Sequence, residues 1–154
     1  MKNKKVLIIC TSIHHGNTLK IAKVMAEVLG ARIMMPADVN SEIMSGYDLI
    51  GFGSGIYNQQ HHSSLFDLLK QLSMQDHKKA FVFSTNTFGL KILNKPFVDK
   101  LIEKGFDVLG DFSCPGFMNY SVTKYFFGGF SKNRPNENDL KKARDFSGKL
   151  WSKM

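Results

Sequence analysis

A polar loop with the residue types of a phosphate-binding site follows the first apolar run of the chain. Residues 6–10 are β-branched or aliphatic apart from a final cysteine, which is typical of a strand buried on both faces. After the loop, apolar residues recur at helical spacing from Leu19 to Leu29, and Gly30 is expected to end that helix. A helix that starts directly after such a loop points backbone N–H groups and the positive end of its dipole at one spot, which suits a phosphate. The candidate phosphate-binding groups are the backbone N–H groups of this loop and the hydroxyls of Thr11, Ser12 and Thr18, with Asn17 closing the turn.

Catalytic and dinucleotide-binding loops do not match this stretch. A nucleotide P-loop requires a lysine where Asn17 stands, and the dinucleotide fingerprint GxGxxG is absent. Cys10 lies where a low-molecular-weight tyrosine phosphatase has its nucleophile, but Gly16 stands where such an enzyme requires an arginine. Ser54 lacks the flanking glycines of a hydrolase nucleophile elbow. The remaining interpretation is a loop that holds a phosphate through backbone N–H groups and hydroxyls without transferring it, so no catalytic residue is predicted.

The elements that must position this loop alternate between strand and helix along the chain. This alternation predicts an α/β fold, a doubly wound five-stranded parallel sheet with helices on both faces. We expect the strands of this sheet in the order 2-1-3-4-5. We expect a single domain over residues 1–154, in which residues 37–47 hold a short helix or only a loop. The later strands are expected at 31–35, 48–55, 80–84 and 106–114, and the later helices are expected to begin near residues 63, 95 and 136.

The expected topology also places a binding site. In such a sheet a ligand binds at the carboxyl ends of the strands, where the strand order reverses. For this order the reversal lies between the first and third strands. The loops at 11–17 and 54–62 should therefore face each other there, with the loop at 85–90 beside them.

Helix ends and the core can be predicted in more detail. Ser63 or Ser64 is expected to cap one helix, and Asn94 is expected to start the next. The apolar stripes of the last two helices place Ile102 and Trp151 in the core.

The polar loop resembles the phosphate loop of the flavodoxin family, whose Gly-Asn-Thr ending stands here as Gly16, Asn17 and Thr18. Residues 53–57 and 134–137 also resemble small flavodoxin-like proteins, and the resemblance covers essentially the whole chain. It implies non-covalent FMN, with the phosphate at residues 11–18, the flavin ring lined by residues 54–58, and its far edge bordered by residues 84–89. The ring-binding residues so implied are Ser54, Gly55, Ile56, Tyr57, Asn58, Ser84, Thr85, Asn86, Thr87 and Gly89.

The resemblance further implies a flexible turn at residues 55–58, which offers a backbone carbonyl to the flavin nitrogen N5. The sequence departs from the best-known flavodoxins in a phosphate loop about one residue longer, through the His14-His15 pair. No tryptophan lies in either flavin loop. Tyr57 and Phe88 are therefore either the residues that stack on the flavin or ordinary loop aromatics on the domain rim.

Two histidine pairs, His14-His15 and His61-His62, follow the first and third strands and should lie near the reversal point. Adjacent histidines in an extended loop point apart and no carboxylate accompanies them, so no metal site is predicted. They are expected either to donate hydrogen bonds beside the phosphate or the flavin edge, or to be exposed in the loops.

Composition and charge indicate the kind of partner and the cellular compartment to expect. The formal net charge is +8, but most lysines lie on the outer faces of expected helices, so an acidic redox partner is a better interpretation than nucleic acid. No signal peptide or membrane span is expected, and Cys10 and Cys114 form no CxxC pair. These features favour a reducing cytoplasm.

Three functions remain open on the sequence. The first is an FMN-binding electron-transfer protein, and the second is an FMN-dependent oxidoreductase acting on a quinone or similar flat acceptor. The third is a binding module that kept the fold and lost the flavin. The aromatic segment 115–135 is expected to form a lid, a substrate wall, a docking surface or a short helix over the sheet edge.

Overall fold

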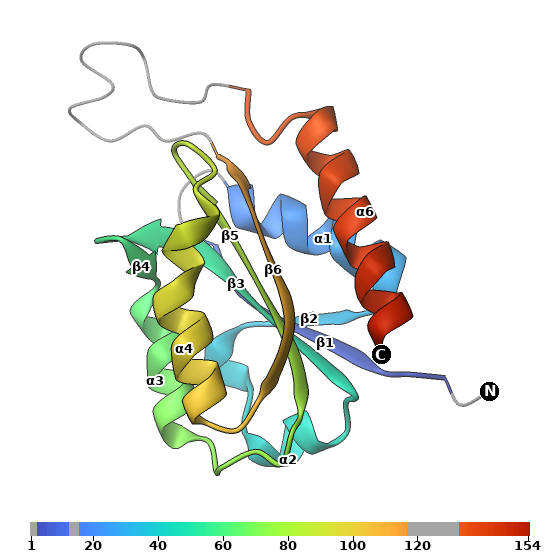
Figure 1. Ribbon diagram of the computed structural model, residues 1–154, viewed down its shortest axis with the longest axis vertical. Helices are drawn as coiled ribbons and strands as arrows, with labels where there is room; N and C mark the ends of the chain where they lie inside the picture. Colours follow the sequence, from blue (N-terminus) through green and yellow to red (C-terminus); the bar gives the residue numbers. More distant parts are fainter. Residues whose placement is uncertain (1–2, 13–15, 117–132) are drawn as a thin grey trace.

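The central feature of the computed structural model is a twisted parallel sheet with helices on both faces (Figure 1). The structure describes residues 3–12, 16–116 and 133–154 of the chain. The parallel strands run in the order β2-β1-β3-β5-β6, which is the predicted 2-1-3-4-5 order when only parallel strands are counted. Their bounds are β1 Val6–Thr11, β2 Arg32–Met34, β3 Leu49–Tyr57, β5 Lys79–Asn86 and β6 Asp107–Pro115.

A further strand, β4 (Gln60–His61), was not predicted. It pairs antiparallel with the end of β3, so the sheet has six strands and not five. Its two residues follow directly on a tight turn, and a strand this short has no hydrophobic alternation that a sequence pattern could reveal.

The helices form a layer on each face of the sheet. Figure 1 shows α1 and α6 on one face and α3 and α4 on the other. Residues 37–47, for which the sequence left a helix or a loop open, contain a short helix together with part of a 3₁₀ turn. The bounds are α1 Asn17–Leu29, α2 Ser41–Ser45, α3 Ser63–Gln71, α4 Lys95–Glu103 and α6 Glu137–Lys153, with 3₁₀ turns at Pro36–Asp38 and Lys91–Asn94.

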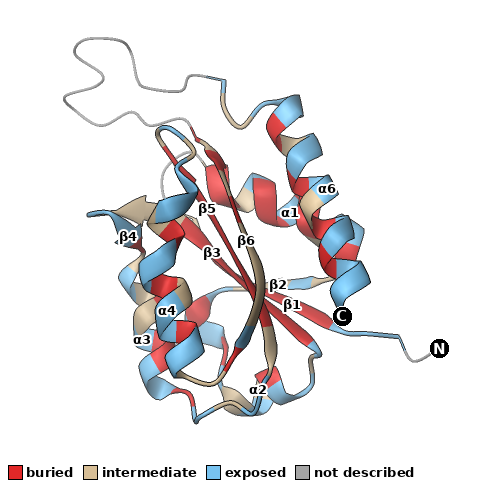
Figure 2. Cartoon of the chain, in the orientation of Figure 1, coloured by how far each residue is buried: buried red, intermediate tan, exposed pale blue. Residues whose placement is uncertain are grey.

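Alternating side chains of the sheet build two apolar cores, one on each face. Figure 2 shows that the central strands are buried along much of their length and that the helices beside them carry buried stretches. On β1, Val6, Ile8 and Cys10 pack beneath α1 and α6. Leu7 and Ile9 pack on the opposite side, with the core of α3 and α4. This is the two-faced burial that the continuous apolar run predicted.

Two glycines of β3 make room for aromatic rings of the neighbouring strand. A Cβ atom at Gly51 would lie 2.3 Å from the ring of Phe81, and one at Gly53 would lie 2.1 Å from the ring of Phe83. Both rings are fully buried. The rings of β5 thus fill the space above β3 that side chains of β3 would otherwise take.

Two core predictions were wrong. Ile102 is 56% exposed and Trp151 is 46% exposed, because both lie toward the outer side of their helices rather than against the sheet. Asn94 directly precedes α4, as predicted, but its side chain makes no cap bond: it is buried and donates to Asp111 and to the carbonyl of Phe112.

The outer helix ends are well defined. Gly30 ends α1 in the left-handed conformation, with φ of 61°, as predicted. At α6, Asn136 accepts a bond from the N–H of Asp139, whose carboxylate accepts one from the N–H of Asn136. Arg134 donates two further bonds to the same, almost fully buried carboxylate, at 2.5 and 2.6 Å. This ion pair fixes the point at which the chain returns to the sheet.

Candidate functional site

Hydroxyl groups line the carboxyl edge of the sheet at one level. The strand register places Thr11 of β1 beside Ser54 of β3, Ser54 beside Ser84 of β5, and Ser84 beside Ser113 of β6. Thr11, Ser54 and Ser84 are buried, and the Ser84 hydroxyl donates to Ser113 at 3.1 Å. The hydroxyls therefore form one polar row near the carboxyl ends of four strands, at the edge where the strand order predicted a site.

The start of α1 has the features of an anion site. Gly16 precedes the helix with φ of 64°, a left-handed conformation that glycine adopts without strain. The Ser12 hydroxyl accepts a bond from the N–H of Leu19 at 3.2 Å, so the loop folds back over the first turn. No acidic residue lies in that turn of the 13-residue helix, so nothing there opposes a bound anion. The predicted site residues Ile13, His14 and His15 lie outside the described residues.

A buried hydroxyl pair joins the start of α1 to the end of β5. Thr18 and Thr85 are 2% and 4% exposed, and their Oγ1 atoms lie 2.8 Å apart. Gly116 packs against the same place, since a Cβ atom there would lie 2.9 Å from the side-chain nitrogen of Asn17 and 3.1 Å from Thr85. The start of α1 and the end of β5 thus meet at Thr18 and Thr85.

The turn predicted at residues 55–58 lies further along the chain. Residues 55–57 continue strand β3, and the reversal falls at Asn58 and Gln59, with φ of 50° and 65°. Left-handed backbone at two successive non-glycine residues is unusual, and pairing with β4 maintains it. A Cβ atom at Gly55 would lie 3.1 Å from the Tyr57 hydroxyl oxygen, so that side chain folds back along the strand.

His61 is buried in the core rather than exposed in a loop. It is 1% exposed, its Nε2 lies 3.1 Å from the carbonyl oxygen of Phe83, and its ring packs on Phe97 with centroids 5.2 Å apart. Burial lowers the pKa of His61 from 6.5 to about 4, although the bond to Phe83 acts in the opposite direction. The imidazole is therefore neutral at physiological pH and donates from Nε2. It anchors β4 to the sheet.

His62 begins α3 in place of the serines predicted to cap it. Its Nδ1 accepts the N–H of Ser64 at 3.1 Å and lies 2.8 Å from the Ser64 hydroxyl. Ser64 also contacts the hydroxyl of Thr11 at 2.8 Å. His62 thus lies close to the hydroxyl row, but its ring bonds Ser64 of α3 and its N–H donates to the Ser54 hydroxyl of β3.

The turn after β5 is closed by the side chain of Asn86. Asn86 accepts the N–H of Leu90 at 2.8 Å and donates to Ser113 at 2.9 Å. Ser84, Thr85 and Asn86 are buried members of β5, whereas the sequence placed residues 85–89 in a loop. Thr87 and Gly89 lie on the turn itself, and the side chain of Phe88 is 71% exposed at its tip.

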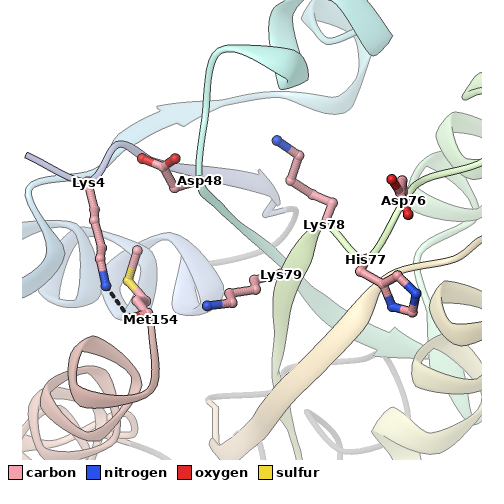
Figure 3. A pocket seen from close by; sticks show the side chains of 7 residues that line it. All are labelled: Lys4, Asp48, Asp76, His77, Lys78, Lys79 and Met154. Carbon is pink, nitrogen blue, oxygen red and sulfur yellow. Dashed lines mark hydrogen bonds between the residues drawn. The ribbon is translucent and has the colours of Figure 1, made fainter. Parts of the chain in front are cut away.

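A separate hollow of about 390 Å³ lies at the opposite, amino edge of the sheet (Figure 3). Its charged groups are largely engaged with the protein: Lys4 donates to the carbonyl of Met154, Lys78 donates to the carbonyl of Tyr47 at 2.5 Å, and His77 pairs with Asp107 at 2.9 Å. The bond to Asp107 raises the pKa of His77. These contacts hold the ends of strands together and lie far from the hydroxyl row.

Other classes of site receive no support from the described part of the chain. Residues 3–12, 16–116 and 133–154 contain no group of three His, Cys, Asp or Glu side chains placed to hold a metal ion. Burial raises the pKa of both Cys10 and Cys114 to about 12, so neither thiol is a ready nucleophile. In the same residues, no helix has the length and apolar character needed to cross a membrane. The aromatic segment is outside the description from residue 117 to residue 132.

Sequence reasoning missed Ser64 and Ser113 as parts of this edge. Ser113 could have been found by aligning the ends of β5 and β6, because both strands carry a serine at the same level. Ser64 has no such signal, since its contact with Thr11 depends on how α3 sits over the sheet.

The comparisons with known proteins agree with this architecture. The profile described as a flavodoxin domain matches residues 8–122, and the chain belongs to the flavodoxin family. An uncharacterised protein of Methanocaldococcus jannaschii is 49% identical over 145 residues, covering 93% of this chain and 95% of that protein.

Two solved structures are similar in fold. A flavodoxin from the domain Archaea has a TM-score of 0.70 at 13% identity and covers 97% of each chain. A Fusobacterium nucleatum flavodoxin bound to flavin mononucleotide has a TM-score of 0.68 at 15% identity, covering 98% of this chain and 99% of that one. The fold is therefore flavodoxin-like, as the sequence predicted.

Proposed function

We propose that this protein binds FMN without a covalent bond and carries electrons between redox partners. The observation that carries the proposal is the start of α1, where hydroxyl groups and a helix N-terminus free of acidic side chains meet at the edge between β1 and β3. This donor set fits a phosphate monoester. Membership of the flavodoxin family, and the FMN held by the Fusobacterium nucleatum protein, support the choice of FMN.

The residues of the phosphate end have distinct roles in this proposal. Ser12 and Thr18 donate hydroxyl bonds to the phosphate oxygens, while Gly16 lets the backbone approach closely. Thr85 holds the Thr18 hydroxyl in place through their contact of 2.8 Å. The electron chemistry belongs to the flavin, which accepts and releases electrons one or two at a time, so the protein needs no acid, base or nucleophile there.

The flavin ring is proposed to lie between the β3–β4 hairpin and the turn after β5. Residues 55–58 and the turn at Thr87 and Gly89 border it, and Tyr57 is the aromatic side chain best placed on that hairpin to shield it. Ser54, Ser84 and Asn86 are buried and hold the loops in shape.

An acidic redox partner in the cytoplasm is proposed from charge. The chain carries a formal +8, which would attract an acidic surface and speed association at low salt.

A titration with FMN tests the proposal directly. Purified protein mixed with FMN should give a shifted flavin absorption spectrum and quenched fluorescence. Ser12→Ala and Thr18→Ala should each weaken FMN binding by about tenfold or more, because one lost hydrogen bond to a charged group costs about 1.5–3 kcal/mol. Thr18→Ser, which keeps the hydroxyl, is the matched control. Unchanged affinity in both alanine variants would show that the phosphate binds elsewhere.

The same preparation separates a carrier from an enzyme. A carrier reduces an acceptor slowly unless a flavoprotein reductase is added. Rapid turnover of NAD(P)H with a quinone, without any added reductase, would favour the oxidoreductase.

A further inference from the structure

A continuous chain of hydrogen bonds joins the two loops that the proposed function assigns to opposite ends of FMN. It runs from Thr11 at the end of β1 through Ser64 and His62 of α3 to Ser54 of β3. The contacts are Thr11 to Ser64 at 2.8 Å, Ser64 to His62 Nδ1 at 2.8 Å, and the His62 N–H to the Ser54 hydroxyl at 3.0 Å.

In the middle of this hydrogen-bond chain, the donor and the acceptor of each bond follow from what His62 Nδ1 accepts. His62 Nδ1 accepts the backbone N–H of Ser64 at 3.1 Å, so it carries a lone pair and its ring proton lies on Nε2. The Ser64 hydroxyl, 2.8 Å from the same nitrogen, donates its proton to it, and Ser64 then accepts the proton of Thr11. The proton of Thr11 is thereby committed to the protein.

The other end of this hydrogen-bond chain is Ser54 on β3, the strand that forms the β3–β4 hairpin. Ser54 is fully buried, accepts the N–H of His62 and donates to the carbonyl of Gly55 at 2.7 Å. The imidazole of His62 meets the ring of Tyr57 edge to face, with centroids 5.3 Å apart. His62 therefore contacts both the Ser54 hydroxyl and the aromatic side chain of Tyr57 at the candidate ring site.

We propose that His62 and Ser64 are positioning residues that set the distance between the phosphate subsite and the flavin-ring subsite, with Thr11 as their link to the phosphate loop and not as a phosphate ligand. This role rests on the proposed function. A ligand that occupies both subsites gains from having them held at the correct spacing before it binds, whereas a ligand that occupies one subsite does not.

The test compares a ligand that occupies both subsites with ligands that occupy only one. Three ligands are titrated into each variant: FMN, riboflavin, which lacks the phosphate, and inorganic phosphate, followed by NMR. In Ser64→Ala, FMN affinity should fall about five- to tenfold, while riboflavin and phosphate affinities stay within about twofold of the parent protein.

Two further variants complete the design. Thr11→Val breaks the same chain at its other end with a side chain of equal shape, and should behave as Ser64→Ala does. Ser63→Ala is the matched control, because it makes the same change in the same helical turn at an exposed side chain, and should leave all three affinities unchanged.

Each alternative outcome has one meaning. Equal losses for FMN and riboflavin in Ser64→Ala would reveal a general structural role and overturn the positioning role. Unchanged or increased FMN affinity in Ser64→Ala would overturn it as well. A lower affinity for inorganic phosphate in Thr11→Val would also overturn it, because Thr11 would then be a direct phosphate ligand. Failure of the parent protein to bind FMN would instead overturn the proposed function and this inference together.

Discussion

The buried hydroxyl pair of Thr18 and Thr85 predicts a strong energetic coupling between the start of α1 and the end of β5. The perturbation is threonine to valine at each position and at both, which replaces a hydroxyl by a methyl group of the same shape. Because both side chains are at least 96% buried, each single variant leaves one hydroxyl without its partner, 2.8 Å away in the native protein.

The magnitude follows from that geometry. An unsatisfied buried hydroxyl costs about 1–3 kcal/mol, so each single variant should lower the free energy of unfolding by roughly that amount. The double variant removes both hydroxyls and should cost only about 0–1 kcal/mol, because replacing both partners by apolar groups is nearly neutral. In a chain of this size the single variants should melt about 2–9 °C below the parent.

Urea unfolding of the ligand-free protein, followed by circular dichroism, measures these differences. Ser152→Ala is the control, since its hydroxyl bonds to the carbonyl of Lys149 on the exposed end of α6 and its loss should change little. The double variant should regain stability but not FMN affinity, because Thr18 is still absent. Losses that simply add in the double variant would refute the coupling between the two hydroxyls.

Three further predictions concern charge. Burial lowers the pKa of His61 from 6.5 to about 4, so as the pH falls the unfolded chain binds a proton at His61 before the folded protein does. About 3 kcal/mol of the free energy of unfolding should therefore be lost between pH 6.5 and pH 4. Urea unfolding at several pH values should show this slope, and His61→Gln should remove it. Burial would raise the pKa of Asp139, but the bonds from Arg134 and Asn136 outweigh it and hold that pKa below its ordinary value. This stabilisation is present above the unfolded pKa of about 3.9 and disappears as the pH falls through the folded pKa. Asp139→Asn should therefore lower the free energy of unfolding by about 2 kcal/mol at pH 7 and make it depend less steeply on pH in the acid range. An unchanged acid dependence would contradict the assignment. Finally, the net charge of +8 should favour the negatively charged, fully reduced flavin, so redox titration should give a less negative second potential than acidic flavodoxins have, with the difference shrinking in high salt.

The sequence predicted the elements whose signals are local. The apolar run of β1, the helical spacing of α1 and the glycine at residue 30 each depend on neighbouring residues, and all three appear where expected. The strand order followed from general rules of crossover handedness and from the family resemblance.

The features that the sequence did not predict depend on contacts between distant residues. The β3–β4 turn uses Asn58 and Gln59 in left-handed conformations without a glycine, so no local signal marks it. His62 caps α3 because its ring nitrogen Nδ1 accepts the N–H of Ser64, two residues further along the chain; the two neighbouring serines made this role easy to misassign. Trp151 was assigned to the core from helical spacing alone, which cannot tell that this residue lies on the outer side of the last turn.

The two glycines of β3 have a consequence for how this chain can change over time. Since the rings of Phe81 and Phe83 occupy the volume beside Gly51 and Gly53, any larger residue on β3 requires a smaller one at the matching position on β5. Substitutions at these sites should therefore be accepted only in compensating pairs. The middle of the sheet should thus change as a coupled unit, two positions at a time.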